Sequence, residues 1–383
     1  MYRIALWSIL VAANLGGCST DMSQQLAIEP GVKTRPLAVI CDPPEAVPGE
    51  QVEVRLYLYA PDPGALATSW RVALDYRMDI YDELESEGAY VSLDETMEDL
   101  RWDAADDGTI IQGFSFVVPE STMFVSSGLP ERVTDPLPPE MLELIDPAQE
   151  GYVTRAEILT FLRNVDPATL APATLAAVRA YSDLFGCQIR LRGTITGDID
   201  LDVTKNLTVR YSKKFGSDNV NTNPGIRWVG IIEVQGRDVD DRDEIASYDT
   251  DTTYVYHATE PSRVERTLKI NPAYTYYALV DHEIERYRSP AGIEHEEDHE
   301  YHWHYRKFTP DANEDPLFVD DDGSEIEMEE MDEIIRFDPP NWSVATGFQF
   351  FLVVRDFRIE WRMFHATPGA AYVAVEGILE PTD

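Results

Sequence analysis

The sequence predicts a mainly β protein made of two β-sandwich domains, the first of which carries a helical insert. Three observations support this fold class. Short runs in which apolar and polar residues alternate recur along the chain, as half-buried strands require. The period lengthens to that of a helix only between residues 138 and 186. The length of 383 residues also exceeds what one small hydrophobic core organises.

The N-terminal seventeen residues have the layout of a secretory signal. Arg3 supplies a positive charge, residues 4–13 are almost all apolar, and Leu15-Gly16-Gly17 precede Cys18. The apolar run is too short to span a bilayer. The alternatives are an ordinary cleaved signal and a buried first strand.

This arrangement resembles the lipobox of bacterial lipoproteins. The resemblance implies that residues 1–17 are removed and that Cys18 carries acyl chains such as palmitate, which hold a protein on a membrane without a transmembrane helix. Ser19 after the cysteine implies the outer membrane, at its periplasmic face or at the cell surface. Residues 18–35 are polar and without periodicity, so we expect a tether.

The formal net charge of −39 restricts the possible partners. Such an acidic surface repels nucleic acid, so no nucleic-acid binding is expected. It suits a cation-rich exterior or the binding of divalent ions. With 44% hydrophobic residues, the chain still has enough apolar side chains for a substantial core.

The chain has three cysteines, and lipidation of Cys18 leaves the pair Cys41 and Cys187. In an oxidising compartment, such a pair within strand-like sequence predicts a disulfide. The alternative is two buried free thiols.

The first domain is predicted over residues 36–213. Its expected strands share alternation or a short apolar run: Leu37–Cys41, Gln51–Tyr59, Ser69–Tyr76, Thr109–Val118, Cys187–Ile195 and Asn206–Tyr211. A strand, the turn from Asp42 to Glu50 with its Pro48-Gly49-Glu50 end, an alternating strand and a strand with Trp70 together resemble the opening of bacterial immunoglobulin-like domains. The resemblance extends to those of envelope lipoproteins and implies a β-sandwich.

Residues 138–186 depart from that class because their apolar residues have helical spacing. Pro138-Pro139 begins a first helix, Ile158, Leu159 and Leu162 line a second, and Pro172 begins a third that ends at Gly186. We expect this insert to cover an open end or edge of the sheets.

The second domain is predicted over residues 214–383, after a polar, turn-rich segment at residues 213–223. Its expected strands are Ile226–Val234, Thr253–His257, Val264–Ile270, Tyr274–Val280, Glu300–Phe308, Gly347–Val354 and Phe357–Met363. Residues 348–354 are apolar almost throughout, which indicates a central strand. The last two of these strands resemble the final hairpin of the same immunoglobulin-like class.

The insert contains a twelve-residue run from Asp146 to Glu157 that resembles an EF-hand loop. The oxygen ligands that the resemblance implies are Asp146, Glu150, Tyr152 through its carbonyl, Thr154 and Glu157, with Gly151 at the turn. Ala148 stands where a further oxygen ligand is required, and the entering helix is short. Two interpretations stay open: a weak calcium site, and a relic loop without metal.

Residues 294–304 contain His295-Glu296-x-x-His299, formally the zinc-protease signature. The signature requires a helix with an apolar face, whereas every residue from 294 to 300 is polar. We therefore expect a solvated loop that leads into a strand. His302 and His304 share one face of that strand, so weak transition-metal binding is the alternative.

Residues 311–338 form a third acidic stretch, for which we expect a solvated loop rather than a calcium site. The sequence has neither a nucleophile-elbow motif nor a glycine-rich phosphate loop. We expect a binding or structural module without catalysis, acting on a protein or glycan partner and requiring no cofactor except, in one interpretation, calcium. The alternatives are a metal-dependent hydrolase that uses the His295–His304 cluster, and a calcium-responsive module.

Overall fold

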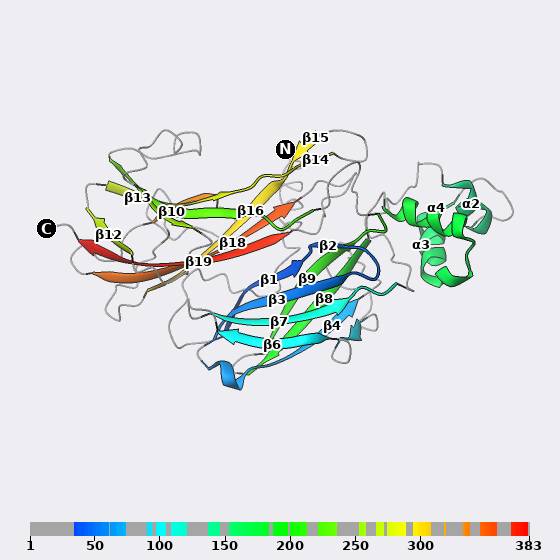
Figure 1. Cartoon of the computed structure of the whole chain (residues 1–383), viewed down its shortest axis with the longest axis horizontal. Coiled ribbons are helices and arrows are strands. Elements are labelled where there is room, and N and C mark those ends of the chain that lie inside the picture. Colours follow the sequence, from blue (N-terminus) through cyan, green and yellow to red (C-terminus); the bar gives the residue numbers. More distant parts are fainter. Residues whose placement is uncertain are drawn as a thin grey trace, which may run out of the picture.

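The computed structural model describes residues 34–60, 62–73, 90–93, 97–104, 109–120, 137–145, 153–183, 187–197, 200–212, 221–235, 253–257, 266–271, 274–288, 294–307, 318, 332–337, 345–357 and 369–381. This part of the chain is mainly β, as predicted (Figure 1). Its strands form four sheets of four or five strands and a separate two-stranded hairpin.

Two sheets from the N-terminal half form a first β-sandwich. One has the strand order β1-β3-β7-β6 and the other β2-β9-β8-β4-β5. The strands are β1 (Arg35–Asp42), β2 (Glu45–Ala46), β3 (Gln51–Tyr59), β4 (Ala67–Ala73), β5 (Tyr90–Ser92), β6 (Glu98–Ala104), β7 (Ile110–Val117), β8 (Cys187–Thr196) and β9 (Leu201–Val209), with a short 3₁₀ turn at Pro63–Ala65.

Alternation within the strands builds the core of this sandwich. In β3, Val52, Val54, Leu56 and Leu58 are fully buried, and the residues between them point away from the core. Trp70 of β4 packs against Phe114 of β7 and donates a 2.9 Å hydrogen bond from its indole Nε1 to Oε1 of Gln112. This bond satisfies the polar atoms of two fully buried side chains.

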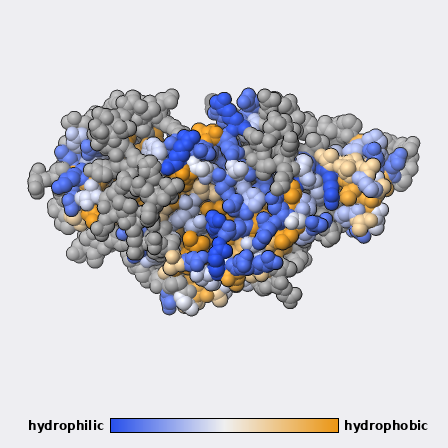
Figure 2. Space-filling view, viewed as in Figure 1, coloured by the Kyte–Doolittle hydropathy of each residue, from blue (hydrophilic) through white to orange (hydrophobic). Residues whose placement is uncertain are grey.

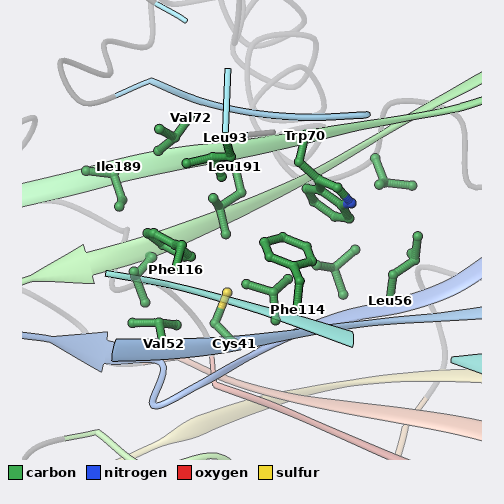
Figure 3. Close-up of a cluster of buried hydrophobic side chains, with 14 of the residues drawn as sticks. Cys41, Val52, Leu56, Trp70, Val72, Leu93, Phe114, Phe116, Ile189 and Leu191 are labelled. Carbon is green, nitrogen blue, oxygen red and sulfur yellow. The ribbon is translucent and has the colours of Figure 1, made fainter. Parts of the chain in front are cut away.

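The predicted disulfide between Cys41 and Cys187 is absent, because Cys41 is a free, fully buried thiol. Its side chain points into the apolar core beside Val52 and Phe114 (Figure 3). Cys187 begins β8 in the opposite sheet, where its backbone pairs with Val209. An even cysteine count in an oxidising compartment says nothing of the Cα separation and side-chain direction that a disulfide requires.

Three helices lie between β7 and β8: α2 (Pro139–Ile145), α3 (Arg155–Asn164) and α4 (Pro172–Asp183), with a 3₁₀ turn at Pro167–Thr169. Their buried residues form a separate small core. They lie beyond one end of the first sandwich (Figure 1). The Asp183 carboxylate joins them to it, since it accepts hydrogen bonds from the backbone N–H groups of Tyr211 (2.7 Å) and Ser212 (2.8 Å).

Two sheets from the C-terminal half form a second sandwich, with strand orders β11-β10-β13-β17 and β12-β19-β18-β16. The strands are β10 (Ile226–Gln235), β11 (Thr253–His257), β12 (Arg266–Ile270), β13 (Tyr274–His282), β16 (Asp298–Lys307), β17 (Ile334–Phe337), β18 (Thr346–Phe357) and β19 (Ala370–Pro381). The hairpin of β14 (Arg286–Arg288) and β15 (Glu294–Glu296) lies before β16. The predicted strand Phe357–Met363 lies outside the described residues except for Phe357, which ends β18.

The two sandwiches pack face to face. The outer surface of β1 and β3 lies against the outer surface of β18 and β19. The buried residues of this contact are Leu37, Ala38, Ile40, Tyr59, Phe351, Val353, Ala370 and Ala374. The rings of Tyr57 and Tyr372 contact each other across it, with centroids 4.4 Å apart and planes inclined by 30°. Strands β1 and β18 are therefore buried on both faces, which explains why each is apolar almost throughout.

The surface of the described part is mostly hydrophilic on the face shown in Figure 2. The large apolar side chains that the described part exposes are Leu100 and Trp102 of β6, Val117 of β7, Leu144 of α2, and Ile284 after β13. Within the described residues, we find no helix with the length and apolar character to cross a membrane.

Candidate functional site

The histidine-rich stretch is extended rather than helical. His295 lies in β15 and His299 in β16. Four residues of extended chain span roughly 13 Å, whereas one helical turn brings such residues within about 6 Å. The strand predicted at Glu300–Phe308 is confirmed as β16, and the preceding residues form the β14–β15 hairpin rather than a loop. Because the signature brings its two histidines together only on a helix, His295 and His299 do not form the zinc-binding pair that it describes.

The histidines of this stretch occupy different environments. The His295 ring stacks on Tyr287 within the hairpin, with centroids 5.4 Å apart. The His299 ring packs against His282, with centroids 4.2 Å apart. His282 Nε2 in turn lies 2.7 Å from the hydroxyl of Tyr301. Among the described residues, no group of three or more histidine, cysteine, aspartate or glutamate side chains is placed to hold a metal ion.

His302 and His304 lie on the face of β16 that is turned toward the first sandwich. They pair in register with Val353 and Phe351 of β18, which lie in the inter-sandwich contact. Within the described part, neither Nε2 atom has a hydrogen-bond partner. Both imidazoles are therefore components of the contact between the sandwiches.

Burial keeps these imidazoles neutral. Desolvation lowers the pKa of His304 to about 3, and the nearby His302, Arg35 and Arg355 lower it further in the same direction. Desolvation also lowers the pKa of His302, against the opposing effect of Glu300, whose Oε2 lies 3.6 Å from His302 Nε2. The guanidinium groups of Arg35 and Arg355 near His304 make this position unfavourable for a metal cation.

The EF-hand-like loop is described only at its end, and Asp146, Glu150 and Tyr152 lie outside the described residues. Thr154 and Glu157 form a capping box at the start of α3. The Glu157 carboxylate accepts a 2.7 Å hydrogen bond from Thr154 N, and Glu157 N donates to Thr154 Oγ1 at 3.3 Å. These two residues thus have a structural role that needs no metal, and the calcium site stays a prediction.

Most of the acidic stretch at residues 311–338 also lies outside the described residues. Of it, the structure describes Phe318 and residues 332–337. Phe318 is fully buried and contacts Trp303 and Tyr305 edge-on in the second core. The stretch therefore contributes an aromatic side chain to the core, which its acidic composition did not indicate.

Within the described residues, a buried polar cluster lies where the chain passes from one sandwich to the other, at residues 221–225. We call this region the joint. Glu45 and Arg210, both nearly fully buried, form an ion pair with Oε1 and Nε 3.3 Å apart. Glu45 Oε2 also accepts a 3.0 Å hydrogen bond from the backbone N–H of Asn221. Arg210 Nη1 donates to the carbonyl oxygen of Asp183 at the end of α4, so Arg210 links the helices, the first sandwich and the joint.

Asn223 connects the joint to both sandwiches. Its Nδ2 donates a 3.0 Å hydrogen bond to the carbonyl oxygen of Cys41 in β1. Its Oδ1 accepts a 3.0 Å hydrogen bond from the backbone N–H of Ala370 in β19. The side-chain amide therefore occupies the place of a peptide group between an edge of one sandwich and a strand of the other.

Asp356 lies at the centre of the joint with no exposed surface. Asn221 Nδ2 lies 3.4 Å from its Oδ1, at the upper end of hydrogen-bond distances. Desolvation, followed by the nearby Glu297 carboxylate, raises the pKa of Asp356 to about 7, while Asn221, Lys205 and the Gly369 N–H oppose the shift.

The chain matches no protein-family model, and a search of curated proteins finds no relative.

We did not predict the joint from the sequence, although two of the segments that form it contain residues typical of such contacts. Glu45 stands in the proline-rich segment Asp42–Gly49, which we interpreted only as a turn. Asn221-Thr222-Asn223 stands in the polar segment that we interpreted only as a domain boundary. Asparagines directly before Pro224-Gly225 are typical of side chains that bond to nearby backbone, but the identity of their partners depends on the packing of the two sandwiches.

Proposed function

We propose that this chain is a lipid-anchored protein of the bacterial outer membrane that presents two β-sandwiches, held together as one rigid body, to a protein or glycan partner. The anchor is inferred from the sequence before Cys18. The observation that carries the binding role is the buried face-to-face contact of the sandwiches, because it fixes the loops of both sandwiches relative to one another.

A surface whose loops are already held in fixed positions favours binding of a partner. Association requires free energy to order whatever moves in the unbound protein, and a prearranged surface reduces that requirement. Burial of an aliphatic or aromatic side chain such as Leu37, Phe351 or Val353 contributes roughly 1.5–3 kcal/mol. Several such residues therefore hold the contact strongly, and the tether expected at residues 18–35 leaves the orientation of the whole body free.

The immunoglobulin-like character of the first sandwich forms part of the proposal. Its support is the Pro48-Gly49-Glu50 turn that leads into β3. Gly49 has a φ of +84°, which favours glycine, and its N–H donates a 2.7 Å hydrogen bond to the carbonyl oxygen of Val118 after β7. The turn thus aligns β3 with β7 at the start of their shared core.

The anchor is tested with Cys18→Ser. Cells that express the parent or the variant are supplied with labelled palmitate, and the membrane fraction is separated. We expect label and membrane association in the parent and loss of both in the variant. Equal membrane association of the variant would overturn the anchor.

The binding role is tested by proximity labelling in native cells. A labelling enzyme is fused to the full chain, and the matched control carries only residues 1–35 before the same enzyme. We expect a small set of envelope components to be labelled by the full chain alone. Identical labelling by the two fusions would contradict a binding role for the sandwiches.

A further inference from the structure

The joint buries an unbalanced set of charges. Two cationic and three acidic side chains meet there with at most 8% of their surface exposed: Lys205, Arg210, Glu45, Glu297 and Asp356. If all five were ionised, the set would carry one excess negative charge. A buried uncompensated charge is unfavourable, and a carboxyl group in such a place normally binds a proton instead.

The hydrogen bonds identify Asp356 as the carboxyl that binds this proton. Both oxygens of Glu45 have partners, Arg210 and the Asn221 N–H. The Asp356 carboxyl has a long contact from Asn221 Nδ2 to its Oδ1 and lies near the Gly369 N–H, and within the described part its Oδ2 has no hydrogen-bond partner. The side-chain oxygen of Asn221 likewise has none there.

Gly369 leaves the space that the Asp356 carboxyl occupies. A Cβ atom at Gly369 would stand 2.7 Å from Asp356 Oδ2 and 2.8 Å from the carbonyl oxygen of Thr222. The Gly369 N–H favours the ionised carboxyl, whereas burial favours the neutral one and has the larger effect on the pKa of Asp356.

We propose that Asp356 carries a proton in the closed joint at mildly acidic pH and releases it when the joint opens. The joint is then a proton-linked latch between the two sandwiches. Opening exposes the carboxyl to water, where it ionises, so a rise in pH favours the open form.

The groups that face Asp356 come from several elements. Glu297, between β15 and β16, disfavours ionisation, and Lys205 of β9 favours it. His299 of β16 is the cross-strand partner of Asp356. The Glu45–Arg210 pair lies on the other side of Asn221 and is balanced in itself.

The sign of the pH dependence follows from the pKa of Asp356, which is raised to about 7 in the closed form from an ordinary value of 3.8. The proton stabilises the closed joint fully below pH 3.8, and this stabilisation is lost as the pH rises toward 7. Above pH 7, the carboxyl is ionised in both forms, and the dependence ends.

The first test is infrared spectroscopy of the full chain and of Asp356→Asn at pH 5.5. We expect the carbonyl stretch of a protonated carboxylic acid in the difference spectrum of the two proteins. Asp103→Asn, at an aspartate with 59% of its side chain exposed, is the matched control and should give no such band. Absence of the band in the Asp356→Asn difference would overturn the proposal.

The second test is hydrogen exchange, which measures opening. The protection factors of the backbone amides at residues 221–225 are calculated with the chemical exchange rate at each pH. The protection factor of the parent is then divided by that of Asp356→Asn. We expect this ratio to fall about tenfold per pH unit between pH 5 and pH 7 and to level off above pH 7. A ratio independent of pH would overturn the proposal.

If Asp356→Asn does not fold, infrared spectroscopy of the parent alone replaces both tests. We expect the carbonyl stretch of the protonated carboxylic acid at pH 5.5 and its loss by pH 8.5. A spectrum unchanged over that range would overturn the proposal.

Discussion

The side-chain amide of Asn223 donates a 3.0 Å hydrogen bond to the carbonyl oxygen of Cys41, and thereby attaches the segment between the sandwiches to the edge strand β1. The same amide accepts a hydrogen bond from the N–H of Ala370 in the other sandwich. One side chain therefore satisfies two backbone groups that belong to different sandwiches.

Replacement of Asn223 should destabilise the protein according to the groups left unsatisfied. Asn223→Ala removes the amide that bonds to the Cys41 carbonyl oxygen and the Ala370 N–H. It should lower the free energy of unfolding by about 1–3 kcal/mol. Asn223→Asp should lower it further, because a carboxylate oxygen then faces the carbonyl oxygen of Cys41. Urea unfolding measures both variants. Asn164→Ala, which removes an exposed hydrogen bond to Thr160, is the control. Equal stability of Asn223→Ala and the parent would contradict this role.

Removal of one partner of the Glu45–Arg210 pair should lower the free energy of unfolding more than replacement of both partners by apolar residues. Arg210→Met alone leaves the Glu45 carboxylate buried without its cation and should lower the free energy of unfolding by about 3–5 kcal/mol. The double variant Glu45→Leu with Arg210→Met removes both charges, so we expect it to be more stable than Arg210→Met. Guanidinium unfolding of the three proteins measures this difference. A double variant less stable than Arg210→Met would contradict the prediction.

Gly193 should tolerate no side chain, because its Cα approaches the Trp70 ring. A Cβ atom at this position would stand 2.8 Å from Trp70 Cη2. Gly193→Ala should therefore shift the indole, strain its hydrogen bond to Gln112, and lower the free energy of unfolding by about 1–3 kcal/mol. Thermal unfolding and tryptophan fluorescence report the change. Gly64→Ala, where the nearest atom is 3.5 Å away on the Asp62 side chain, is the matched control and should change neither.

His304 should make the protein sensitive to acid. Its pKa is lowered to about 3 in the folded protein from an ordinary value of 6.5. The neutral imidazole therefore contributes full stability above pH 6.5, and this stability is lost as the pH falls from 6.5 toward 3. Between pH 6.5 and pH 3, His304 should lower the free energy of unfolding of the parent by about 1.4 kcal/mol per pH unit. His304→Gln should lack this contribution.

The measurement for His304 is the difference in unfolding free energy between pH 7 and pH 4.5. Asp356 contributes the opposite slope between pH 3.8 and pH 7, so the two groups oppose each other over this range. As the pH falls, His304→Gln should lose less stability than the parent, and Asp356→Asn should lose more. His295→Gln in the hairpin is the control. Parallel pH profiles for the two variants would contradict both assignments.

The sequence predicted strands of two kinds, those in which apolar and polar residues alternate and those that are apolar almost throughout. Strand β3 was predicted at its observed bounds because Val52, Val54, Leu56 and Leu58 alternate with polar residues. The apolar run at 348–354 was correctly predicted as a central strand, since β18 lies between β16 and β19. The same reasoning placed His302 and His304 on one face of β16.

Strands β6 and β19 were missed for opposite reasons. Every residue of β6 is exposed, so burial imposes no period on Glu98–Ala104. The N-terminal part of strand β19 is covered on both faces, and Ala370, Tyr372 and Ala374 lie together in the contact between the sandwiches. Neither pattern has the period of a half-buried strand.

The joint and the face-to-face contact could not be predicted, because both depend on which outer face of one sandwich meets the other. The apolar character of β1 indicated burial, but not that the covering surface is β18 and β19. The pairing of Glu45 with Arg210 links residues 165 positions apart. Alternation within a strand says nothing of such distant partners.

The rigid connection of the two sandwiches is the central claim, and a distance measurement between spin labels tests it most directly. The labels are placed at Asp103→Cys in β6 and Arg286→Cys in β14, both at exposed positions, in a chain with Cys18→Ser and Cys187→Ser. Cys41 is protected by burial, which raises the pKa of its thiol to about 12. We expect one narrow distance distribution at pH 5.5. A broad distribution, or two separate maxima, at this pH would contradict the claim that the sandwiches form one body.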